Sequence, residues 1–284
     1  MATKRIDEGD GWFARAVDHE GASEASRARA LYDHGYLVFW AGRYDLAAQR
    51  FAEARALAEA LDDHDLEALA LAGSARVVLN DDPAEAVRLL RRAVAVTAES
   101  PASPGRSSAL HVLGVALQMS GDLEAAREVM LERLEAGRAA NDQSIVFVES
   151  ANLSMVERQL GNLNEAEALS REAVRIAVER RDQMAIPWVL NGLAAVTAAK
   201  SKQERAATLL GAAEGLLAQA GGEWPPDERA QYQETLARLA TAPSADVERW
   251  RQAGSAMTLE EAAAYALADG AADERSRRAR LEQR

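Results

Sequence analysis

The sequence predicts an all-α protein, a right-handed superhelical solenoid of helical hairpins closed by a C-terminal helical cap. Alanine recurs at a nearly constant interval along most of the chain. Polar connectors separate long segments that have helical periodicity. The 284 residues are 48% hydrophobic and 27% charged, which supplies enough apolar side chain for a continuous core.

The repeat is clearest at its small buried positions. Alanines expected in the second helix of each hairpin are separated by 39, 40, 40 and 40 residues: Ala47, Ala86, Ala126, Ala166 and Ala206. Small residues recur where the first helix crosses the second: Gly35, Ser74, Gly114, Ser154 and Ala194. The position expected to fill the space above the crossing is occupied by Phe51, Leu90, Met130, Ser170 and Leu210. Two helices approach closely only where one offers little side chain, and a large neighbour then fills the gap.

The turns within the hairpins are expected at one shared position: Gly42, Asp81, Gly121, Gly161 and Ser201. In the first hairpin Gly42 is followed by Tyr44, Ala47 and Phe51. This spacing resembles the tetratricopeptide repeat. The period of about 40 exceeds the usual 34 of that repeat and overlaps the range of HEAT and armadillo repeats. The Gly-x-Tyr turn favours tetratricopeptide-like hairpins, five in number, with lengthened helices and loops.

The ends of the solenoid are predicted from breaks and caps. Residues 9–18, with Trp12 and Phe13, are expected to form a half-repeat, a second helix without its own partner. Inside the solenoid, the segment Asp82-Pro83-Ala84-Glu85 predicts the start of the second helix of one hairpin, with an N-cap, a first-turn proline and an acid favourable to the helix dipole. The solenoid is therefore expected over residues 1–223.

A glycine and proline cluster at 221–226 ends the repeat region. Helices are then expected over 226–240, 246–253 and 259–268, the last opened by a capping box from Thr258 to Glu261. These capping helices span 224–270. A charged tail follows over 271–284, and because acids are mixed with its arginines it is expected to be a solvated, frayed helix rather than a phosphate-binding arm.

Net charge, the length of apolar runs and cysteine content exclude several classes of protein. A net charge of -12 and a pI near 5.0 argue against direct nucleic-acid binding, which needs clustered positive charge. Apolar runs are far shorter than the roughly 20 residues of a membrane span. The first residues carry acids where a secretory signal would be apolar, so a cytoplasmic location is expected. Without cysteine, disulfides and thiolate metal sites are excluded.

Three segments resemble a known family. They are residues 205–216, Pro225-Pro226-Asp227-Glu228-Arg229, and the run from Trp250 to Leu267; the N-terminal stretch 8–16 adds to them. Together they are similar to the helical region of large bacterial ATP-binding transcriptional regulators of the LuxR type and of the adenylate-cyclase-associated type. The resemblance implies a sensor or protein-interaction module whose repeats receive a ligand or partner and restrain output domains.

The chain departs from that family in two respects. It contains no Gly-x-x-x-x-Gly-Lys-Ser/Thr loop, so ATP binding of that kind is not implied. A helix-turn-helix unit after Leu267 is not expected either, so DNA binding is not carried over. Both a free-standing relative that kept only the repeats and a piece of a larger regulator remain open.

Candidate ligand-binding residues follow from the repeat frame, in which one face of each first helix lines the concave groove. They are Tyr32, Tyr36, Trp40, Leu71, His111, Val115, Met119, Asn152, Met155, Arg158, Trp188 and Asn191. Only Arg158 supplies positive charge, which favours an apolar small molecule or a hydrophobic partner helix over an acidic peptide. Packing between helices is an equally open interpretation of each aromatic residue, since a one-position error in frame rotates a side chain by about 100°.

Three functions are compatible with these residues. A non-enzymatic binding module is favoured, with no metal and no cofactor. The alternative is a biosynthetic enzyme using the apolar groove for cyclisation or isomerisation, with Tyr36, His111, Glu149 and Trp188 as candidate groups. His111 is also placed with Glu149, Asn152 and Arg158, although a lone histidine in such a groove more often packs or forms hydrogen bonds. The third function is a scaffold that forms a homodimer through Trp12 and Phe13 of the half-repeat.

Overall fold

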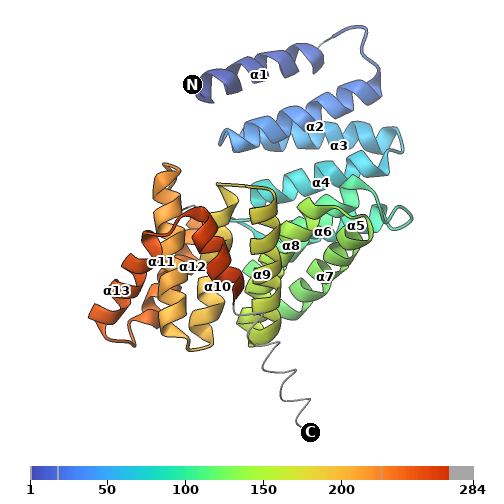
Figure 1. Cartoon of the computed structure of the whole chain (residues 1–284). Coiled ribbons are helices and arrows are strands. Elements are labelled where there is room, and N and C mark those ends of the chain that lie inside the picture. Colours follow the sequence, from blue (N-terminus) through green and yellow to red (C-terminus); the bar gives the residue numbers. More distant parts are fainter. Residues whose placement is uncertain (1, 18, 225, 269–284) are drawn as a thin grey trace. The chain divides into compact units, whose positions relative to one another are not determined.

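The computed structural model describes residues 2–17, 19–224 and 226–268, and all regular secondary structure within those ranges is helical (Figure 1). The helices group by their contacts into two compact units, Met1–Ala136 and Gly137–Arg284. Among the described residues no helix combines the length and apolar character needed to cross a membrane. The prediction of an all-α fold is confirmed.

The first unit is a stack of antiparallel helices. Its elements are α1 (Ala2–Val17), α2 (Glu24–Trp40), α3 (Tyr44–Ala60), α4 (His64–Val78), α5 (Pro83–Val96), α6 (Pro104–Met119) and α7 (Leu123–Ala139), the last running past the boundary. Helices α2 and α3 pack as one hairpin and α4 and α5 as the next, while α3 on α4 and α5 on α6 join successive hairpins. This is the stacking predicted for a solenoid of helical hairpins.

The second unit repeats the arrangement and then departs from it. Its elements are α8 (Gln143–Leu160), α9 (Leu163–Glu179), α10 (Ala185–Ala199), α11 (Gln203–Gln219), α12 (Pro226–Leu239), α13 (Ser244–Ser255) and a helix over residues 259–268. Helices α8 and α9 form one hairpin, and α10 and α11 form another. Helix α12 packs mainly on α10, and α13 packs on α11, so the last helices cover the final hairpin.

The predicted crossing residues form the repeating part of the core. All five alanines of the 40-residue repeat are completely buried. A Cβ added to Gly35 would stand 2.8 Å from the Phe51 ring, and one added to Gly114 would stand 2.7 Å from Cγ of Met130. Each glycine therefore makes room for the large side chain of its own hairpin, as the spacing predicts.

Turn and cap chemistry agree with the sequence. Gly42, Gly121 and Gly161 have φ angles between 75° and 86°, the left-handed conformation that glycine adopts without steric cost. The Asp82 carboxylate accepts a hydrogen bond from the backbone N–H of Glu85 at 3.0 Å. The hydroxyl of Thr258 accepts from the Glu261 N–H while the Glu261 carboxylate accepts from the Thr258 N–H, which is the predicted capping box.

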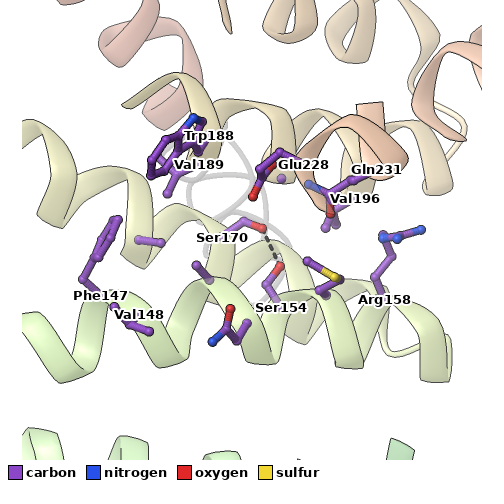
Figure 2. Close-up of a pocket in the computed structure, with 15 residues that line it drawn as sticks. Phe147, Val148, Ser154, Arg158, Ser170, Trp188, Val189, Val196, Glu228 and Gln231 are labelled. Atoms are coloured by element: carbon purple, nitrogen blue, oxygen red, sulfur yellow. Dashed lines mark hydrogen bonds between the residues drawn. The ribbon is translucent and has the colours of Figure 1, made fainter. Parts of the chain in front are cut away.

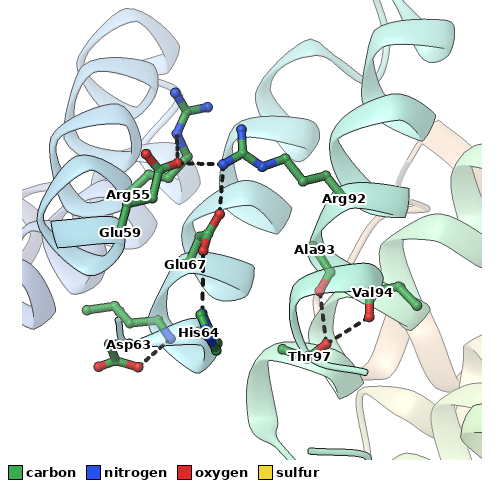
Figure 3. Close-up of polar contacts among 10 residues, drawn as sticks. Arg55, Glu59, Asp63, His64, Glu67, Arg92, Ala93, Val94 and Thr97 are labelled. Carbon is green, nitrogen blue, oxygen red and sulfur yellow. Dashed lines mark hydrogen bonds and ion pairs between the residues drawn. The ribbon is translucent and has the colours of Figure 1, made fainter. Parts of the chain in front are cut away.

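An ion network joins consecutive hairpins of the first unit (Figure 3). Arg92 on α5 donates to Glu59 on α3 at 2.8 Å and to the buried carboxylate of Glu67 on α4 at 2.9 Å. Asp63 caps α4 by accepting from the N–H of Leu66 at 3.0 Å. The acidic turn before α4 thus has a structural role, because it supplies the cap of that helix.

The N-terminal helix is longer than the predicted half-repeat over 9–18. Helix α1 begins at Ala2 and runs through Gly9, where an added Cβ would stand 2.9 Å from Leu37 of α2. Asp10 holds it in place by accepting one hydrogen bond from Arg43 at 2.5 Å and contacting Nε2 of the buried His34 at 2.6 Å. Arg43 and then His34 lower the pKa of Asp10 through these bonds.

The C-terminal helices pack with almost no side chain between backbones. A Cβ added to Gly211 of α11 would stand 2.0 Å from the backbone oxygen of Arg251, and one added to Gly254 of α13 would stand 2.0 Å from that of Thr208. The predicted capping helices are present, with slightly different bounds. The predicted tail 271–284 lies outside the described residues. The boundary between the two compact units, at Ala136, falls within the region predicted as one solenoid over 1–223.

Candidate ligand-binding cavity

The fourth hairpin breaks the packing rule of the others. Where Gly35 meets Phe51 and Gly114 meets Met130, this hairpin has two serines, Ser154 and Ser170. Their hydroxyl oxygens lie 2.5 Å apart, and Ser154 also donates to the backbone oxygen of Ala166 at 2.9 Å. The pair satisfies its own hydrogen bonds but leaves the volume of the expected large side chain unfilled.

A cavity of about 220 Å³ lies beside this pair in the second unit (Figure 2). Helices α8, α9, α10 and α12 all contribute to its walls. The apolar lining consists of Phe147, Val148, Ala151, Met155, Ala173, Trp188, Val189, Gly192 and Val196. The cavity exceeds the volume of about 150 Å³ at which an apolar cavity in a protein core binds benzene.

Polar groups enter the cavity wall from α12. Figure 2 shows the Glu228 and Gln231 side chains extending toward the Ser154–Ser170 pair. Gln231 is only 7% exposed, and its side-chain amide has no hydrogen-bond partner among the residues the structure describes. Because its amide atoms are not fully buried and the residue lines the cavity, this group can pair with a bound molecule.

Arg158 closes one end of the cavity, with its charge balanced by the protein. Its guanidinium donates to both carboxylate oxygens of Glu234 on α12, at 2.8 and 3.0 Å. The hydrogen bond from Arg158 lowers the pKa of Glu234, more than burial raises it. This ion pair connects α8 to α12 across the cavity and leaves no unbalanced positive charge on Arg158.

Asn191 holds Glu228 in place, the residue of α12 that lines the cavity together with Gln231. Its side-chain N–H donates to the Glu228 carboxylate at 2.9 Å and to the Glu228 backbone oxygen at 3.2 Å. Asn191 is completely buried and does not line the cavity. Its contribution is therefore to hold Glu228 and the first turn of α12 in place.

Of the predicted site residues in the second unit, Asn152, Met155, Arg158 and Trp188 line this cavity, and Asn191 lies behind it. The indole N–H of Trp188 is buried and has no hydrogen-bond partner within the described part of the chain. The repeat frame thus identified residues that lie together on α8 and α10, the first helices of two successive hairpins. Whether they bind a ligand stays a prediction.

The predicted residues of the first unit fall into two groups. Tyr32, Tyr36 and Trp40 follow one another along α2 with ring centroids 6.2 and 6.1 Å apart, and Trp40 is 66% exposed. His111 and Val115 are half-buried on α6, and Met119 is 52% exposed.

Leu71 needs a correction. It is completely buried against Ala68, Ala93 and Ala109, so it packs between helices and is not presented to a ligand.

Several cavity residues were missed by the sequence reasoning. Phe147 lies one turn ahead of the predicted groove positions, and Glu228 and Gln231 belong to a helix predicted only as a cap. Ser170 carried a usable signal, because it occupies a position where the four other hairpins have Phe, Leu or Met. A small polar residue at a position that needs bulk predicts either collapse or a hollow.

The groups proposed for acid–base chemistry are not gathered at the cavity. Glu149 is completely buried in α8 and is not part of the lining, and His111 and Tyr36 belong to the first unit. No cluster of three or more metal-ligating side chains occurs within the described ranges.

The half-repeat residues have different environments. Trp12 is 65% exposed with Arg15 over its ring, while Phe13 stacks on His34. A homodimer through these residues stays a prediction.

Two family models match parts of the chain. Both describe the tetratricopeptide repeat, and they cover residues 26–99 and 151–179. These segments are tetratricopeptide repeats. They include nearly all of the first two hairpins and part of the hairpin that carries the Ser154–Ser170 pair. A comparison with curated proteins gives no significant match.

Solved structures share the fold at low sequence identity. BtubC (BKLC) from P. vanneervenii is 17% identical, with a TM-score of 0.66 over 78% of this chain and 94% of that chain. Nearly identical TPR-like repeats from Podosopora anserina, described as a kinesin light chain, are 20% identical, with a TM-score of 0.59 over 70% and 99%. A Rap protein complexed with Competence and Sporulation Factor is 15% identical, with a TM-score of 0.56 over 80% and 62%. These likenesses confirm the helical-repeat fold.

Proposed function

We propose that this chain is a non-enzymatic binding module that holds an apolar small molecule in the cavity of its second unit. The carrying observation is the Ser154–Ser170 pair, which replaces the packing residues of the other hairpins and leaves a hollow lined by Phe147, Met155 and Trp188. Helical repeats commonly present binding surfaces, and ligand sites are typically apolar cavities with a few polar groups. The module acts in the cytoplasm.

The regulatory context rests on the sequence resemblance to large bacterial transcriptional regulators. In that proposal the module senses a molecule and passes the signal to a protein partner. The Rap structure, solved with Competence and Sporulation Factor, is an example of a similar helical fold seen with a bound factor. The exposed rings of Tyr36, Trp40 and Tyr44 offer the first unit a surface for a partner.

The proposal is tested by a substitution that fills the cavity. In Ser170→Met the new side chain should occupy the cavity as Met130 occupies its own hairpin. Native mass spectrometry of the wild-type protein, purified from its own cells, should show a small mass that leaves on denaturation, and this mass should be absent from Ser170→Met. The matched control is Leu210→Met, the same position in the fifth hairpin, where a volume-conserving change should leave the bound mass in place.

Two results would contradict the proposal. One is a wild-type protein that carries no small mass under native conditions. The other is a bound mass retained at equal occupancy in Ser170→Met, which would place the ligand elsewhere.

A further inference from the structure

The cavity wall has a polarity that is informative about the ligand, provided that the cavity binds a small molecule as proposed above. Two charged side chains line it, Arg158 and Glu228. Arg158 is in a two-bond ion pair with Glu234, and Glu228 accepts a hydrogen bond from Asn191. A carboxylate ligand would therefore compete with Glu234 for Arg158 and would lie in the same cavity as the Glu228 carboxylate.

Gln231 offers a different kind of contact. The residue is more than nine-tenths buried, and its side chain lines the cavity and has no hydrogen-bond partner among the described residues. Its nitrogen lies 3.9 Å from the point where a Cβ on Gly192 would stand, so the missing side chain on α10 leaves room beside the amide. A carboxamide has an N–H donor and a carbonyl acceptor side by side.

The group that complements a carboxamide is another neutral donor–acceptor pair. A primary amide or lactam can donate to the Gln231 oxygen and accept from its nitrogen at the same time, and it enters an apolar cavity without the large desolvation cost of a charge. The ligand's apolar body would then lie against Trp188 and Phe147. We infer that the cavity selects an uncharged molecule whose polar end is an amide-type group paired with Gln231.

The experiment compares four probes of nearly the same shape: 2-phenylacetamide, phenylacetate, 2-phenylethylamine and ethylbenzene. Binding to the full chain is followed at pH 7 by ¹H–¹⁵N NMR, with the Trp188 indole N–H as local reporter, assigned from Trp188→Phe. The amide is expected to bind about tenfold more tightly than either charged probe.

Variants on α12 isolate the contact. Gln231→Met keeps the side-chain shape and should weaken 2-phenylacetamide about tenfold while leaving ethylbenzene unchanged, because only the amide loses hydrogen bonds. Gln233→Met, an exposed glutamine on the same helix, is the matched control and should change neither.

The outcomes separate this inference from the proposed function. If ethylbenzene binds but a charged probe equals or exceeds the amide, or if Gln231→Met leaves amide binding unchanged, the inference is wrong and the cavity proposal stands. If none of the four probes binds, both are wrong.

Discussion

At the scale of single residues, side-chain volume at a few repeat positions decides where this chain is solid and where it is hollow. Phe51 and Met130 fill the space that Gly35 and Gly114 leave open. Ser170, at the corresponding position of the fourth hairpin, reaches only as far as Ser154. One residue too small for its place is enough to connect the interior of a hairpin with a cavity under α12.

Glycine controls packing in the opposite sense at the α11–α13 contact. In Gly211→Ala the added Cβ would stand 2.0 Å from the backbone oxygen of Arg251, so the two helices would have to separate. We expect a loss of about 3 kcal/mol in the free energy of unfolding, at the upper end of typical overpacking. Urea denaturation measures it.

The control for this prediction is Gly11→Ala. Gly11 also lies inside a helix, but an added Cβ there meets only the end of Arg15 at 3.6 Å. It should be neutral or stabilise by up to about 1 kcal/mol through helix propensity. Equal effects of the two substitutions would show that the α11–α13 contact can relax.

The sequence predicted some of the residues that line the cavity and missed others, and the difference has a physical reason. Asn152, Met155, Arg158 and Trp188 were found because all four lie on first helices whose facing side follows from the repeat. Leu71 was assigned to the groove, although its own hairpin and the first helix of the next one bury it. Gln231 could not be found, because no local pattern indicates which hairpin a cap helix will cover.

At the scale of elements, α12 is unusual in what it buries. Among the α12 side chains that the structure describes, the buried ones are Gln231, Thr235 and Leu239, and only Leu239 is apolar. The Thr235 hydroxyl bonds back to its own helix at the Gln231 oxygen. Tyr232 and Leu236 add partly buried apolar surface against the core, and the Arg158–Glu234 pair adds a polar contact from α12 to α8.

The pair predicts an acid dependence of stability. The pKa of Glu234 is lowered from its ordinary value of 4.5, first by the hydrogen bond from Arg158. A depressed carboxyl pKa stabilises the fold above pH 4.5 and loses that effect as pH falls through the lowered value. Glu234→Gln should therefore cost about 1 kcal/mol at pH 7, after allowance for solvent screening, and less at pH 3, below the ordinary pKa of a glutamate.

Urea unfolding of both proteins at the two pH values measures this difference. Glu248→Gln is the control, since Glu248 is 72% exposed and its contact with Arg251 is long, at 3.5 Å. A Glu234→Gln effect that persists unchanged at pH 3 would mean that the ion pair is not its cause.

At the scale of the whole molecule, the sequence predicted the class of fold but not its division. The 40-residue repeat fixed five hairpins and their crossing residues, because helix approach is a local steric matter. The boundary between Ala136 and Gly137 falls inside α7, where no break in the helical pattern marks it. Contact density depends on distant residues, and periodicity carries no signal for it.

The division into two units predicts that a destabilising substitution in one unit leaves the stability of the other unchanged. Ala126→Leu places a large side chain at a completely buried crossing in the first unit and should destabilise that unit by about 1–3 kcal/mol. Because repeat structures couple mainly between neighbours, amide hydrogen exchange should rise in α4 to α6 and stay at wild-type rates in α9 to α11. Mass spectrometry after exchange resolves these segments. As a control, Ala136→Leu changes an exposed residue on the same helix and should leave the exchange rates of both units at their wild-type values. A rise of equal size in both units after Ala126→Leu would show that the chain unfolds as one body.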